Sequence, residues 1–120
     1  MIVLETEIIG SKDLKSAAGI TVGFDDNNDF LVELQFSNYV NENESYRKRA
    51  TLSSRDAYRI SERLKIKATA LPEYIYRTYG EKAEASSPAD IKNIYSQILD
   101  YITSSGCRYR MMNLPGKTGR

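Results

Sequence analysis

The fold is decided by residues 19–37, GITVGFDDNNDFLVELQFS. Apolar side chains alternate with small or polar ones on both sides of an Asp and Asn cluster at 25–29. The apolar positions are Ile20, Val22, Phe24, Phe30, Val32, Leu34 and Phe36. A period of two interrupted by turn-forming residues is typical of an antiparallel β-hairpin with one buried face.

The same pattern extends the sheet on both sides of this hairpin. A strand at about 46–52 follows a second polar turn, and the opening residues 2–9 form another. The face opposite the apolar one is polar enough to meet water, so we expect helices to cover one side only. Residues 1–52 therefore predict an antiparallel sheet of about four strands.

Two helices are expected after the sheet. Ser53 is placed to cap the first, which should run to about Ala70, before Pro72. Ser87 and Pro88 begin the second, which stops at Ser105-Gly106. Residues 73–80 between them fit either a short strand or a helical turn. The sequence predicts one α+β domain, 1–120: a sheet (1–52), two helices packed on one face with a connecting segment (53–106), and a C-terminal loop or edge strand with a tail (107–120).

The composition narrows the possible functions. The chain contains no histidine, which removes histidine-based acid–base catalysis and most zinc and iron sites. Cys107 is the only cysteine, so no internal disulfide can form. No apolar run reaches the length of a membrane span. We expect a cytoplasmic protein that is not an enzyme and has no cofactor, metal site or catalytic residues.

Charge is sorted along the chain, with a net charge of −7 over residues 1–45 and +8 over the remaining 75. On the first helix, Arg55, Arg59 and Arg63 recur every fourth residue and form a ridge beside the apolar stripe. Such a ridge is slightly unfavourable unless an anion or the acidic turns lie nearby. It is either a binding surface or solvated charge that the acidic turns neutralise.

A second basic segment, Cys107-Arg108-Tyr109-Arg110-Met111, follows the last helix. Arginine binds phosphate in a bidentate manner and a tyrosine ring stacks on bases, so Arg108, Tyr109 and Arg110 are candidate ligand-binding residues. The alternative is an edge strand with Tyr109 inward and both arginines outward, followed by a frayed tail at 117–120.

The order of these parts resembles the small phage-encoded sponge proteins of the Thoeris anti-defence type. The shared features are a β-rich first half, a polar loop at 81–87 before the last helix, and the Arg and aromatic loop at 108–113 after it. The resemblance implies an oligomer that sequesters a cyclic nucleotide signal without cleaving it. From the residues themselves, we expect a non-catalytic homo-oligomer that binds an anionic nucleotide-type molecule or single-stranded nucleic acid. The alternative is a protein-interaction module whose basic helix docks on an acidic partner.

Overall fold

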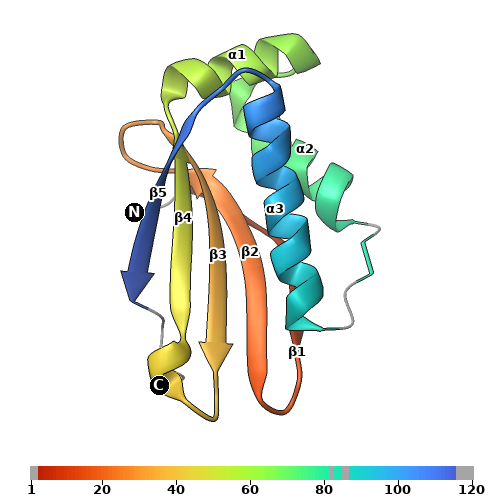
Figure 1. Cartoon of the computed structure of the whole chain (residues 1–120). Helices are drawn as coiled ribbons and strands as arrows, with labels where there is room; N and C mark the ends of the chain where they lie inside the picture. Colours follow the sequence, from red (N-terminus) through yellow and green to blue (C-terminus); the bar gives the residue numbers. More distant parts are fainter. Residues whose placement is uncertain (1–2, 82, 85–86, 116–120) are drawn as a thin grey trace.

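The computed structural model describes residues 3–81, 83–84 and 87–115, so the predicted tail at 117–120 lies outside the described residues. It confirms the α+β class, with one antiparallel sheet of five strands in the order β1-β2-β3-β4-β5 (Figure 1). The strands are β1 (Val3–Lys12), β2 (Ser16–Phe24), β3 (Phe30–Asn38), β4 (Tyr46–Leu52) and β5 (Tyr109–Pro115). The fifth strand is the segment after the last helix, for which a loop and an edge strand had both been possible.

The structure confirms the predicted central hairpin and gives its register. Val22 of β2 pairs with Val32 of β3, and Ile20 pairs with Leu34. In the turn, the Asp25 carboxylate accepts hydrogen bonds from the backbone N–H groups of residues 27 (2.8 Å) and 29 (3.0 Å). The cluster favours a tight turn because the Asp25 side chain accepts hydrogen bonds from backbone N–H groups of the same turn.

The helical segments follow β4 and cover one face of the sheet, as predicted. They are α1 (Ser54–Leu64), the 3-10 turn η2 (Ala68–Ala70), α2 (Leu71–Ile75), the π-helical turn η3 (Tyr76–Gly80) and α3 (Pro88–Ser104), with one further 3-10 turn, η1 (Glu42–Glu44), before β4. In Figure 1, α3 lies in front of the sheet and α1 crosses the end of the strands. Within the described ranges, no helix has the length and apolar character needed to cross a membrane.

The first helix is shorter than its pattern indicated. Its start is confirmed, because the Ser53 hydroxyl accepts the N–H of Asp56 at 3.2 Å. Its end is not at Ala70: α1 stops at Leu64, and Lys65 takes the left-handed conformation at φ 58°. The apolar spacing nevertheless continues, because η2 and α2 resume on the same side and bury Leu71 in the core.

The segment 73–80 is helical, and its last residue fixes the position of β1. Gly80 lies so close to β1 that a Cβ there would be 2.1 Å from the carbonyl oxygen of Ile8. Ile8 is the extra residue of a register shift between Glu7 and Ile9. The bulge at Ile8 and the close approach of Gly80 therefore cover this edge of the sheet, as bulges and covering segments commonly do.

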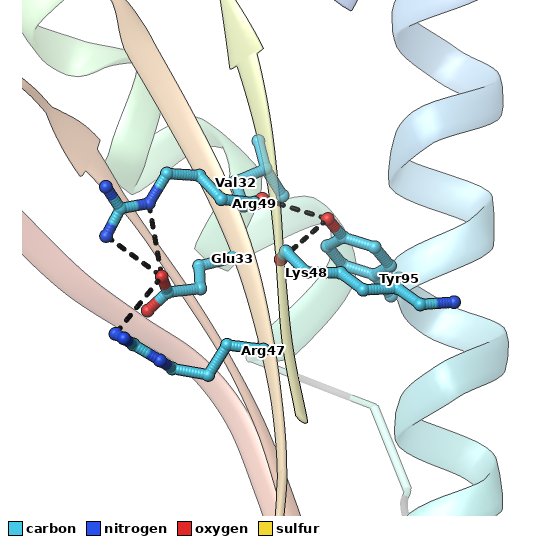
Figure 2. A network of polar contacts seen from close by, with 6 residues as sticks. All are labelled: Val32, Glu33, Arg47, Lys48, Arg49 and Tyr95. Carbon is cyan, nitrogen blue, oxygen red and sulfur yellow. Dashed lines mark hydrogen bonds and ion pairs between the residues drawn. The ribbon is translucent and has the colours of Figure 1, made fainter. Parts of the chain in front are cut away.

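A buried tyrosine joins α3 to the sheet. Tyr95 is 4% exposed, and its hydroxyl lies 3.0 Å from the carbonyl oxygen of Val32 and 3.1 Å from that of Lys48. Figure 2 shows the ring reaching from α3 to β3 and β4. The hydroxyl donates to these carbonyls, and its contact fixes the position of the helix over the sheet.

Candidate functional site

The two basic segments that the sequence singled out meet at one corner of the fold. Leu52 and Thr51, at the end of β4, pair with Tyr109 and Arg110 at the start of β5. One carboxylate oxygen of Asp56, in the first turn of α1, lies 3.5 Å from the backbone N–H of Arg108. The junction of β4 and α1 therefore lies directly beside the connection from α3 to β5.

We call this region the arginine corner and define it by Arg55, Arg59, Arg63, Arg108 and Arg110. Two of its members have partners within the protein. The Arg63 guanidinium donates a hydrogen bond to the carbonyl oxygen of Ser105, where a cation also complements the dipole of α3. Arg59 lies 3.9 Å from a carboxylate oxygen of Asp56. Arg63 therefore joins α1 to the end of α3, whereas the contact of Arg59 lies within α1.

The other three arginines are exposed and unpaired. Within the part of the chain that the structure describes, the side chains of Arg55, Arg108 and Arg110 make no hydrogen bond or ion pair. Arg55 also occupies the first turn of α1, where a positive charge opposes the helix dipole. The arginine corner thus carries positive charge that no acidic side chain among the described residues neutralises at Arg55, Arg108 and Arg110.

Arg110 lies on the open face of the sheet, at the start of β5. Ala50 and Leu52 of β4 are buried beneath the helices, so Thr51 between them lies on the other face, together with its partner Arg110. Tyr109, paired with Leu52, lies on the helix side and packs against the core. The structure therefore does not bring the Tyr109 ring together with Arg110, as stacking on a ligand held by that arginine would require.

Cys107 lies beneath the corner as a buried thiol. Its sulfur is 3.7 Å from the backbone carbonyl oxygen of Asp56. Burial raises the pKa of the Cys107 thiol, and the Asp56 charge raises it further, while Arg59 and Arg63 act in the opposite direction. A protonated, buried thiol packs as a small apolar group and is a poor nucleophile.

The acidic first half of the chain neutralises a different set of arginines. Glu33, 7% exposed on the open face, accepts hydrogen bonds from Arg49 at 3.1 Å through Nε and at 3.0 Å through Nη2. Arg47 lies 3.8 Å from the same oxygen. Figure 2 shows this cluster on the side of the sheet opposite Tyr95. Sequence reasoning missed the cluster, because only the pairing of Glu33 with Arg49 across the strands identifies it.

Among the described residues, no group of three or more acidic or cysteine side chains could hold a metal ion. Of the α1 arginines, Arg59 contacts Asp56. Asp29, in the turn between β2 and β3, accepts the backbone N–H of Ser54 at 3.0 Å.

No family model, no curated protein and no solved structure matches this chain. The arginine corner must therefore be interpreted from its own chemistry.

Proposed function

We propose that the protein is a non-catalytic binder that holds a phosphate-bearing, nucleotide-type anion at the arginine corner. The observation that supports the proposal is the gathering of two separate basic segments, with the side chains of Arg55, Arg108 and Arg110 left unpaired among the described residues. Guanidinium groups bind phosphate through paired N–H donors. The ligand is sequestered rather than converted.

The electrostatics of α1 favour an anion at this place. Like charges four residues apart on a helix cost about 0.2–0.5 kcal/mol per pair, and a cation in the first turn costs about 0.3–1 kcal/mol against the dipole. Asp56 offsets part of this cost. A bound phosphate would remove most of the remainder and would contribute charge-assisted hydrogen bonds as well.

Phosphate contacts fit this surface better than base stacking does. Tyr109 packs against the core. On the open face, the paired residues of β3 (31–37), β4 (47–51) and β5 (110–114) include no aromatic side chain. Affinity for a nucleotide should therefore depend steeply on salt and weakly on the identity of the base.

Thermal unfolding with a panel of anions tests the proposal. The panel is ATP, pyrophosphate, a cyclic dinucleotide and a short oligothymidylate, each at 50 and 300 mM KCl. A ligand at 100 times its Kd stabilises the folded state by about 2.7 kcal/mol. For a chain of 120 residues this raises Tm by roughly 10 °C. We expect a rise with at least one phosphate compound that shrinks at the higher salt concentration.

Two variants locate the binding. The double variant Arg55→Ala/Arg108→Ala should lose the rise in Tm. Arg77→Ala is the matched control, because Arg77 is an exposed arginine on η3 whose partner is Glu73 at 2.7 Å. No rise with any compound, or an equal rise in the double variant and the wild type, would refute the proposal.

A second candidate, a protein-interaction module, rests on β5. This edge strand exposes 42% of Met111 and 52% of Met112, and one side of its backbone has no strand partner in the described sheet. Antiparallel pairing with a second copy would bring Arg110 toward the opposite end of the partner's sheet, where η1 carries Glu42 and Glu44. Light scattering should then give a dimer mass for the wild type and a monomer mass for Met112→Lys; a monomer for both would eliminate this candidate.

A further inference from the structure

A cavity of about 380 Å³ lies on the far side of α1 from the arginine ridge. Its walls come from the start of β1, the end of β2, the turn between β2 and β3, the first turns of α1, and η2. Pockets that hold small molecules in proteins have volumes of about 300–1,000 Å³. The cavity is therefore large enough for one compact molecule.

Small side chains create this space. Ala57 on α1 and Ala68 on η2 both line the cavity, together with Ser54 and Thr69. The left-handed turn at Lys65 ends α1 and allows the chain to return as η2. Because none of these four side chains is larger than threonine, the two helical segments leave room between them.

The apolar part of the wall is completed by larger residues at the base and the rim. Phe24 is buried in the core, whereas Leu4 and Tyr58 are 50% and 59% exposed. An exposed leucine and an exposed tyrosine at one opening are the kind of side chains that a bound apolar group would cover.

The cavity also has polar side chains that make no hydrogen bond to the described part of the protein. Asn28, Ser54 and Thr69 line it, and in the described part of the chain none of their side chains makes a hydrogen bond. One amide and two hydroxyl groups can both donate and accept. Every lining residue is uncharged, which favours a neutral ligand because transfer of an unpaired charge into such a site is costly.

Backbone strain marks both sides of the opening. Leu4 has φ 56° and Asn28 has φ 64°, both in the left-handed region. Asn tolerates this conformation, but it is uncommon for leucine. Strained residues of this kind persist where the surrounding structure holds them, and they concentrate at binding sites.

From these observations we infer that the cavity is a binding site for a small neutral molecule with one or two rings and an amide-type or hydroxyl group. The rings lie against Phe24 and Tyr58, and the polar group meets Ser54, Thr69 and Asn28. This site is separate from the arginine corner, because the residues of α1 that line it lie on a different side of the helix from Arg55 and Arg59.

A titration of the ¹⁵N-labelled protein with benzamide and with indole, each to 10 mM, tests this inference. We expect saturable shifts of the amide signals of Ala57, Ala68 and Thr69, with Kd values of about 1 mM for molecules of this size. Ala68→Leu fills the cavity and should weaken both probes at least tenfold. Ala89→Leu makes the same change at an exposed site on α3 and should bind as the wild type does.

A second pair of variants keeps the test decisive if Ala68→Leu does not fold. Ser54→Ala/Thr69→Val removes both hydroxyl groups at exposed positions and should weaken benzamide about two- to tenfold. Arg55→Ala/Arg108→Ala should leave benzamide binding unchanged, which separates this site from the proposed anion site. Shifts that do not saturate, benzamide affinity unchanged in Ser54→Ala/Thr69→Val, or a folded Ala68→Leu that binds within twofold of the wild type would overturn the inference.

Discussion

Replacement of Gly80 by alanine should destabilise the protein strongly. The new Cβ would lie 2.1 Å from the carbonyl oxygen of Ile8 and 3.0 Å from its carbonyl carbon. Both are backbone atoms in β1, so no side-chain rotation relieves the overlap, and β1 or η3 must move. Overpacking of this kind costs about 1–3 kcal/mol, and a clash with a paired strand belongs near the upper end. For 120 residues, a loss of about 2–3 kcal/mol lowers Tm by roughly 8–12 °C.

Gly106 provides the matched control, because its substitution tests backbone conformation without a clash. Gly106 has φ 81°, and a Cβ there would meet no atom within 4 Å. A left-handed alanine costs about 1–2 kcal/mol, so Gly106→Ala should lower Tm by about 4–8 °C. Calorimetry of both variants gives the comparison. If Gly80→Ala melts within about 2 °C of the wild type, β1 and η3 are not packed as described.

Three other changes test separate parts of the structure. Tyr95→Phe removes a buried hydroxyl from two carbonyl oxygens and should cost about 1–2 kcal/mol in urea unfolding; a cost near zero would contradict the contacts at 3.0 and 3.1 Å. Iodoacetamide at pH 8 should label native Cys107 at least tenfold more slowly than the urea-unfolded chain, because burial raises the pKa of its thiol; equal rates would show that the thiol is accessible. Backbone N–H groups of residues 15 and 16 lower the pKa of Asp13 below its ordinary 3.8. The ionised Asp13 carboxylate therefore stabilises the folded state above that pH, and this stabilisation is lost as the pH falls through the folded-state pKa. The Tm difference between the wild type and Asp13→Ala should therefore be constant from about pH 5 to 7 and should decrease at lower pH. A Tm difference that increases in acid would contradict the assigned hydrogen bonds.

The sheet was predictable where local patterns determine it. The period-two alternation on both sides of residues 25–29 indicates a hairpin without knowledge of the rest of the chain, and its pairing is as expected. The end of α1 was not predictable in the same way. Lys65 is not a residue type that favours a left-handed stop, and the apolar spacing passes through the break, because η2 and α2 continue to cover the sheet.

The candidate site was predictable in its residue types but not in its assembly. Arginine spacing identified both basic segments, and the pairing of β4 with β5 then placed them together. The direction of each side chain depends on strand register. A shift of one residue would exchange Tyr109 with Arg110 between the two faces. The alternation of 107–111 indicated an edge strand with Tyr109 inward, which the structure has, but a run of five residues is too short to distinguish such a strand from a binding loop. The cavity beside α1 has no sequence signature, because it depends on small residues from segments that meet only in the folded chain.

The position of β5 has a consequence for the order of folding. Strands β1 to β4 follow one another through short turns, so each hairpin can close locally. β5 pairs with β4 only after α1, α2 and α3 have been spanned, and closure of such a long loop is slow relative to a hairpin. The pairing that spans the longest stretch of chain in the sheet thus completes the arginine corner. A molecule in which β5 has not paired with β4 lacks the assembled corner, and capture of an anion there would select molecules in which β5 has joined the sheet.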